Sequence, residues 1–253
     1  MKDFILQNTE QTGLNPTELK KELLQRQEKI VFDEDTHTYT VDNTKLMSGT
    51  AFRQQYFEAF NSEKISSYIA RRDGVKQQDI LDKWQEARDY GTKVHNEIEN
   101  YYLNGSSPST SDAELGIDFF DNYLEKSDTV STHPELQIYD EEAGVAGTID
   151  MIIFHKNGQL SLLDWKTNKK ITKKAYKDKT GFGPCSNIPD TKYHKYTLQM
   201  SLYAHMIEKN ISYKNTTSLI RDLILVHIRP SKYNWWSVTY EKDTIQCMME
   251  DIS

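Results

Sequence analysis

The sequence predicts an α/β protein built in layers, in which helices flank a mixed β-sheet. Three strand candidates, 134–140, 145–154 and 160–166, follow one another through short turn-like links, which is typical of an antiparallel meander. A helix at about 191–209 then leads to an apolar strand candidate at 221–228. This long connection through a helix implies a mixed sheet with helices packed on it, an α/β or α+β layer structure.

The other elements follow from local patterns. Asn15 suits a helix N-cap and Pro16 suits the first helical position, so residues 15–29 are expected to form a helix. Residues 30–41 alternate apolar and polar side chains at the period of two short strands. We therefore expect an N-terminal helical appendage at 1–30 and a single domain at 31–253. The remaining expected elements are helices at 48–72 and 76–104, broken near Asp73-Gly74, a flexible loop at 105–112, a helix at 113–126 and a strand at 235–240.

The composition fits a globular protein in a reducing compartment. The chain has 253 residues, 31 Lys+Arg against 38 Asp+Glu, and a formal net charge of −7. This balance argues against non-specific coating of nucleic acid, although a local basic groove remains compatible with it. The N-terminus lacks the apolar region of a signal peptide. The sequence contains no run of about 18 apolar residues, so we expect no membrane-spanning helix. Cys185 and Cys247 cannot build a disulfide framework or an iron–sulfur cluster, so a cytoplasmic location is expected.

Two carboxylates and a lysine fall on the central strand candidates. Asp164 and Lys166 are two residues apart, so their side chains share one face of the strand. If the link at 155–159 closes a hairpin in which Phe154 faces Leu160, Asp150 lies opposite Asp164. Converging carboxylates repel one another unless a divalent cation lies between them, and oxygen ligands suit Mg²⁺ or Mn²⁺. The alternative is an Asp–Lys pair on a solvated strand face.

Further polar residues have two interpretations each. His95 lies on the same helix face as an isoleucine and a tyrosine, which is compatible with a core histidine or with a ligand. Glu135 opens the first strand of the meander and, taken alone, reads as a solvated side chain. Gln199 and Tyr203 are one helical turn apart and, taken alone, read as the edge of an amphipathic helix.

Four short motifs occur together in one order. They are G-T-K-V-H at 91–95, G-T-I-D at 147–150, L-L-D-W-K-T at 162–167 and Q-M-S-L-Y at 199–203. With these motifs the chain resembles the PD-(D/E)xK nuclease superfamily, in particular its RecB-like exonuclease branch. The segment 38–52 is also similar to the piece that precedes this core in phage exonucleases and in the mitochondrial genome maintenance exonuclease. The resemblance covers about 38–230 and implies a restriction-endonuclease-like core, with the N-terminal helix and hairpin as an elaboration.

The resemblance implies a role for each matching residue. His95, Asp150 and Asp164 would bind Mg²⁺ or Mn²⁺ together with the backbone carbonyl of Trp165, and Lys166 would hold or activate the attacking water. Members with an iron–sulfur cluster carry flanking cysteines that are absent here. The resemblance adds further catalytic candidates: Glu135 beside the metal ligands, and the pair Gln199 and Tyr203, which would orient the lysine or the scissile strand.

A basic stretch within the acidic chain points to DNA. Residues 166–180 contain seven lysines and one acidic residue, and they run on from the strand that carries Asp164. Lysines contact phosphates, and tyrosine rings stack on unpaired bases. A solubilising loop is the alternative interpretation. The candidate DNA contacts are Lys169, Lys170, Lys173, Lys174, Tyr193, Lys195 and Tyr196.

These features together predict a metal-dependent deoxyribonuclease. The resemblance implies an exonuclease that acts on single-stranded DNA or duplex ends in DNA recombination, repair or end processing, in a bacterial or phage-infected cell. Two alternatives stay open. One is a non-catalytic nucleic-acid-binding module on the same fold, and the other is a site-specific endonuclease.

Overall fold

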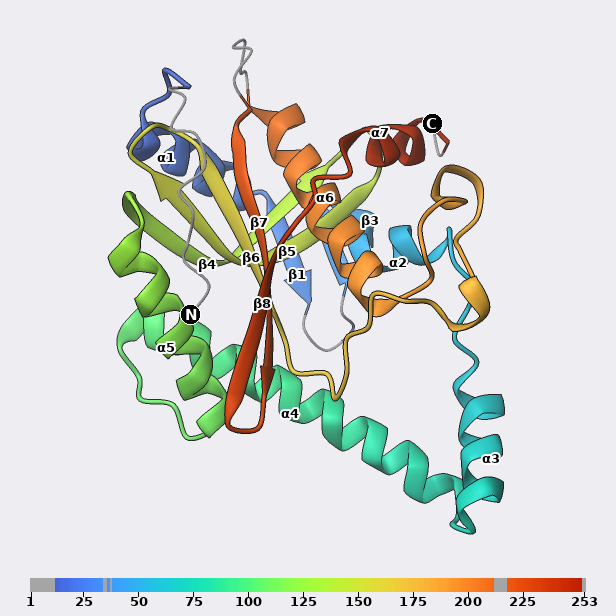
Figure 1. Ribbon diagram of the computed structural model, residues 1–253. Coiled ribbons are helices and arrows are strands. Elements are labelled where there is room, and N and C mark those ends of the chain that lie inside the picture. The colour runs from blue at the N-terminus through green and yellow to red at the C-terminus, as the bar shows by residue number, and fades with distance from the viewer. Residues whose placement is uncertain (1–11, 34–35, 37, 212–217, 252–253) are drawn as a thin grey trace.

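The chain folds into an α/β layer structure in which helices flank an eight-stranded mixed sheet (Figure 1). The computed structural model describes residues 12–33, 36, 38–211 and 218–251. The predicted fold class is thus confirmed at the level of layers and sheet type. The N-terminal half contains α1 (Pro16–Gln27), β1 (Ile30–Asp33), β2 (Thr38–Val41), β3 (Thr44–Ser48), α2 (Gly49–Gln54), α3 (Ser62–Asp73), α4 (Gln77–Asn104) and α5 (Ser111–Lys126). The C-terminal half contains β4 (Thr129–Asp140), β5 (Val145–His155), β6 (Leu160–Lys166), α6 (Lys192–Asn210), β7 (Ile220–Arg229), β8 (Lys232–Val238) and α7 (Lys242–Glu250).

The predicted meander forms the centre of the sheet. β4 pairs antiparallel with β5, and β5 pairs antiparallel with β6. β7 then pairs parallel with β6, as a connection through α6 allows, and β8 pairs antiparallel with β7. At the other side of the sheet, β3 pairs parallel with the start of β5 and extends into the β1–β2–β3 meander.

The sheet has an apolar core on each of its two faces, and alternate residues of its strands contribute to one or the other. The α6 side of the sheet packs against α1, α2, α6 and α7, with Leu162 and Leu225 as central strand residues. The opposite side packs against α4 and α5, with Trp165 and Val226 from the same strands. Neighbouring positions on one strand therefore point to opposite layers, which is the expected consequence of strand geometry. The sheet is held between the two helical layers, and its edges and strand ends are left to carry polar groups.

The helix at the N-terminus is part of the core. Asn15 caps α1, as predicted, because its side chain accepts hydrogen bonds from the backbone N–H groups of Thr17 and Glu18. Leu19 and Leu23 are each 3% exposed and belong to the same apolar cluster as the central strands. The helix that we expected as an appendage therefore shares the core of the sheet through its apolar stripe.

The stretch 48–72 differs from the single helix that we expected. It divides into α2 and α3, because Asn61 caps a new helix by accepting from the Lys64 backbone N–H. Tyr56 and Phe57, between the two helices, turn into the core. The predicted break near Gly74 is present: this glycine adopts a φ of 68° at the end of α3. α3 and the first half of α4 extend away from the sheet (Figure 1).

The residue pattern had predicted neither β3 nor α7, although the resemblance implied a hairpin within 38–52. β3 follows a tight reversal in which Asp42 and Asn43 both have positive φ, the backbone of a two-residue hairpin turn. α7 buries Ile245, Met248 and Met249 at helical spacing. Among the described residues, no helix is both long enough and apolar enough to cross a membrane.

Candidate active site

The site lies where two strands separate along one edge of β5. β4 pairs with β5 from Val145 to His155, with an interruption at Asp150. A strand has only two hydrogen-bonding edges, so β3 and β6 must share the other one. β3 pairs with residues 145–146 and β6 with residues 151–154, which leaves 147–150 between them. The G-T-I-D motif therefore occupies the fork between β3 and β6.

The hairpin register brings the two predicted aspartates together. Phe154 faces Leu160, as predicted, and Met151 faces Leu163, so the next opposed positions are Asp150 and Asp164. The Trp165 backbone N–H donates to Asp150 Oδ2 at 2.8 Å. This bond ties the G-T-I-D segment to β6 at the point where the two strands begin to part.

Lys166 completes the β6 side of the site. Its Nζ lies 2.6 Å from Asp164 Oδ2 and 5.0 Å from the centre of the Tyr196 ring on α6. Asp164 and Lys166 thus share the face of β6 that looks toward α6, as their spacing predicts. The Asp164 carboxylate is turned toward the lysine and is not among the residues whose ligand atoms cluster around Asp150.

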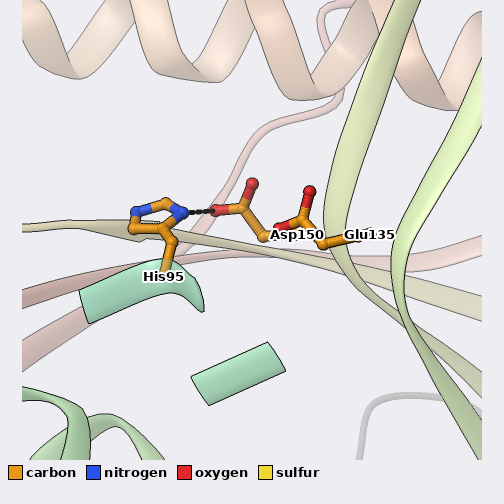
Figure 2. A group of neighbouring side chains, drawn as sticks. All are labelled: His95, Glu135 and Asp150. Atoms are coloured by element: carbon orange, nitrogen blue, oxygen red, sulfur yellow. Dashed lines mark ion pairs between the residues drawn. The ribbon is translucent and has the colours of Figure 1, made fainter. Parts of the chain in front are cut away.

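That cluster consists of His95, Glu135 and Asp150. One nitrogen of His95 and one carboxylate oxygen from each acid lie within 4.8 Å of one another, and the three side chains point toward a common space (Figure 2). His95 Nδ1 is 3.4 Å from Asp150 Oδ2. The histidine comes from α4, on the opposite helical layer from α6, so the two layers meet in this site. The structure therefore brings Glu135, which we had placed beside the ligands, into direct proximity with two of them.

Glu135 reaches this position through an irregular backbone. β4 pairs Pro134 with Met151 and Leu136 with Ile149, so Glu135 faces Asp150 across the two strands. The φ of Glu135 is 48°, in the left-handed region, which costs a non-glycine residue about 1–2 kcal/mol. Backbone strain of this kind persists where the surrounding structure imposes it, and here it turns a second carboxylate toward Asp150.

Burial makes the carboxylates hold protons more tightly. Burial, then the charges of Asp150 and other acids, raises the pKa of Glu135 to about 9. Burial likewise raises the pKa of Asp164 to about 6, although Lys166 opposes the shift. Burial also raises the pKa of Asp150. Several carboxylates gathered in one buried place repel one another, which is the condition that a bound cation relieves.

His95 and Lys166 respond to the same environment in opposite ways. Burial, then the charge of Lys166, lowers the pKa of His95 to about 4, so its imidazole is neutral at pH 7. A hydrogen bond to the Trp165 backbone opposes this lowering of the pKa. A bond that favours the protonated imidazole must be donated by the histidine, so its acceptor is the Trp165 carbonyl. Burial lowers the pKa of Lys166, but Asp164 and Asp150 outweigh it and leave that pKa above its ordinary value, so the lysine is charged.

The donor set could hold a metal ion. Neutral imidazole and carboxylate oxygens are both common metal ligands, and neither Cys185 nor Cys247 belongs to the cluster. His95, Glu135 and Asp150 would hold the ion. Asp164 and the Trp165 carbonyl are the further oxygen donors that the resemblance implies, but the Asp164 carboxylate pairs with Lys166 and lies outside this cluster.

Gln199 and Tyr203 lie against the G-T-I-D segment. Gln199 Nε2 donates to the Tyr203 hydroxyl at 3.0 Å. A Cβ atom added to Gly147 would lie 2.4 Å from Tyr203 Cε1, and one added to Gly49 would lie 2.8 Å from the same atom. The tyrosine ring is therefore closely approached by two glycines, one at the start of α2 and one in the fork of the sheet.

Arg53 and Tyr39 also lie at this site and had not been predicted from the sequence. Arg53 is 7% exposed and donates to Gln199 Oε1 at 3.1 Å, and the Tyr39 hydroxyl lies 2.9 Å from Thr148 Oγ1. A signal for Arg53 was present: it precedes the aromatic residues Tyr56 and Phe57 by three and four residues, within the stretch that we had expected to be one helix. At that spacing a charged side chain would share an apolar face, where it is costly. Nothing in the local pattern distinguished Tyr39 from an ordinary strand residue.

The predicted DNA contacts form two groups. The exposed lysines of the segment that follows β6 are Lys169, Lys170, Lys173 and Lys174. Lys173 Nζ lies 4.2 Å from the centre of the Tyr193 ring, so this aromatic side chain holds part of the segment against α6. Lys195 is paired with Asp190 at 2.7 Å, and Tyr196 donates to Asn168 beneath Lys166. Lys195 and Tyr196 are thus engaged within the protein.

Comparisons with known proteins identify no family. No family model matches the chain, and no curated protein matches it. Among solved structures, the crystal structure of SSO0001 is similar with a TM-score of 0.36 and 14% sequence identity. The alignment covers 94% of this chain and 86% of that chain.

Proposed function

We propose that this protein is a Mg²⁺- or Mn²⁺-dependent deoxyribonuclease, an exonuclease that hydrolyses phosphodiester bonds in DNA recombination, repair or end processing. The observation that carries the proposal is the convergence of His95, Glu135 and Asp150 within 4.8 Å, beside the Lys166–Asp164 pair. Buried charges of this density lower stability unless they bind something. A site of this kind has the polarity required to bind a cation and a phosphate together.

Each residue has a distinct task in this proposal. A bound divalent ion would supply Lewis-acid activation of water and would offset the charge of the scissile phosphate. Asp150, Glu135 and neutral His95 would hold the ion. Charged Lys166, held by Asp164, orients the attacking water or a phosphate oxygen. Because hydrolysis of a phosphodiester depends mainly on positioning and electrostatics, a rigid lysine on a central strand suits it.

The exposed lysines supply the support for a DNA partner. Lys169 and Lys170 lie shortly after β6, the strand that carries Asp164 and Lys166. A phosphate backbone that enters the site would therefore meet them. The remainder of the chain is acidic enough to bring the net charge to −7, which would confine binding to this region. We place the activity in the cytoplasm of a bacterial or phage-infected cell, because Cys185 and Cys247 are free thiols.

Digestion of end-labelled DNA tests the proposal. Single- and double-stranded substrates, with and without Mg²⁺ or Mn²⁺, should yield mononucleotides from an end only when metal is present. K166M and D150N should not cleave. Internal fragments of defined length would identify a site-specific endonuclease instead. Metal-independent DNA binding without cleavage would identify a non-catalytic module. A protein that shows no DNA binding and no cleavage would refute the proposal.

A further inference from the structure

A continuous set of hydrogen bonds links Arg53 on α2 to Tyr203 on α6. Arg53 Nη1 donates to Gln199 Oε1 at 3.1 Å and to the Lys195 backbone carbonyl at 2.7 Å. Gln199 Nε2 donates to the Tyr203 hydroxyl at 3.0 Å. The Tyr203 ring then rests on Gly147, three residues before Asp150. A residue of α2 is therefore connected to the fork of the sheet through two side chains.

The chemistry of arginine sets the direction of every bond in this set. A guanidinium group has only donors and keeps its charge, so the amide atom that faces Arg53 must be the oxygen. The amide nitrogen of Gln199 then faces Tyr203, and the Tyr203 hydroxyl must accept. Its own proton is left to donate elsewhere. The charges of Asp164 and Asp150 act on this phenol, so the free proton lies in the electric field of the candidate site.

Stability does not explain why an arginine occupies this place. Arg53 is 7% exposed, and its Nε has no hydrogen-bond partner within the described part of the chain. Burial of a charged group with an unpaired donor lowers stability, and an apolar side chain would fill the same space at lower cost. The property that an apolar residue cannot replace is the donor pattern of the guanidinium.

We propose that Arg53 is a positioning residue: by donating to Gln199 it fixes the orientation of that amide and keeps the Tyr203 hydroxyl as a donor toward the scissile phosphate. The catalytic consequence rests on the proposed nuclease function. The orientation of the hydrogen bonds does not, and it can be measured without any cleavage of DNA.

Single-turnover cleavage tests the catalytic consequence. R53M and Y203F should each slow the cleavage step by at least about tenfold, because each removes one oriented donor. The double variant R53M/Y203F should be within about twofold of Y203F alone, since Arg53 acts only through Tyr203. R53K, which keeps a donor-only side chain, should recover most of the rate. Losses that multiply in the double variant would overturn the inference, as would an R53K as slow as R53M.

A fluorine reporter tests the hydrogen-bond direction on its own. With 3-fluorotyrosine incorporated, the ¹⁹F resonance of residue 203 is assigned by its absence in Y203F. In Q199E the carboxylate can only accept, so the Tyr203 hydroxyl becomes its donor and the resonance should move. It should also move in R53M and stay near the wild-type position in R53K. R53Q, whose amide can donate or accept, replaces R53M should R53M not fold.

The two measurements separate the two proposals. A resonance that is unchanged in R53M while it moves in Q199E would show that Arg53 does not set the amide, whatever the nuclease assay gives. The expected resonance shifts without cleavage by the wild-type protein would leave the hydrogen-bond assignment intact and refute the nuclease function.

Discussion

The ring of Tyr203 on α6 rests on β5 at a position where only glycine leaves room for it. A Cβ atom at residue 147 would lie 2.4 Å from Tyr203 Cε1, well inside van der Waals contact. This relationship holds the G-T-I-D segment, and with it Asp150, at a fixed distance from α6. It also explains physically why a glycine stands in this motif of this chain.

Gly147→Ala should lower the free energy of unfolding by about 1–3 kcal/mol, the usual cost of overpacking a filled core. The tyrosine ring has little room to move, because Gly49 also approaches its Cε1 atom closely. Chemical denaturation measures the loss. In a Tyr203→Ala background the same substitution should cost little, because the clash is gone. Equal losses in both backgrounds would show that the contact with Tyr203 is not the cause.

Asp150→Asn should abolish Mn²⁺ binding while the protein remains folded. Without metal the variant should melt at a higher temperature than the wild type, because the charge of Asp150 no longer opposes the ionisation of Glu135. Calorimetric titration with Mn²⁺ and a thermal melt in a chelator measure both effects. Asp118→Asn, an exposed substitution on α5, is the matched control and should change neither. Unaltered Mn²⁺ affinity in Asp150→Asn would refute the metal site.

Lys166→Met should lower the rate of DNA cleavage by at least about a hundredfold, because the residue supplies an oriented charge beside the reacting groups. DNA affinity should change by less than about threefold, since one of many positive charges is lost. Single-turnover kinetics and a binding isotherm separate the two quantities. A variant that binds DNA poorly but cleaves bound DNA normally would move Lys166 from the chemistry to substrate binding.

Replacing Lys169, Lys170, Lys173 and Lys174 by serine should weaken DNA binding and reduce its dependence on salt concentration. Fewer counterions are released when fewer lysines contact phosphates. Cleavage at saturating DNA should stay within about tenfold of the wild type, equivalent to about 1.4 kcal/mol in the barrier. The measurement is DNA affinity across a salt series. Binding equal to wild type at every salt concentration would place the DNA path elsewhere.

His155 should make stability fall as the pH drops below neutrality. It is fully buried, with Nδ1 3.1 Å from Asp128 Oδ1 and Nε2 2.8 Å from Ser161 Oγ. Burial, then the charge of Arg221, lowers its pKa to about 4. In the unfolded chain the histidine pKa is near 6.5. Between pH 6.5 and 4 this histidine is therefore protonated in the unfolded chain but neutral in the folded protein. Titration of His155 therefore lowers the free energy of unfolding as the pH falls from 6.5 to 4.

Denaturation of the wild type and of His155→Gln at several pH values measures this contribution as a difference. The wild type should lose up to about 3 kcal/mol more than the variant between pH 6.5 and pH 4. The comparison cancels the titration of the site carboxylates, which acts in the opposite direction because their pKa values are raised. Parallel curves for the two proteins would contradict the assignment.

The positions of most elements, and the pairing of the central strands, could be predicted from the sequence. A five-residue link closes a hairpin in which Phe154 must face Leu160, and from there simple counting places Asp150 opposite Asp164. Local preferences of this kind act over a few residues, so Asn15 could be recognised as a helix cap and Gly74 as a helix end. The predicted pairing of Asp164 with Lys166 on one face rests on the same local geometry.

Only the tertiary structure decided how distant segments complete the site. Arg53 and Gln199 are 146 residues apart, and no short-range pattern relates them. The left-handed φ of Glu135 arises because β4 must pair with β5 on both sides of that residue while its carboxylate turns toward Asp150. The sequence by itself determined the strands and helices through local side-chain geometry. The packing of α2, α4 and α6 around one fork in the sheet determined which of their side chains meet, because such contacts depend on the fold of the whole chain.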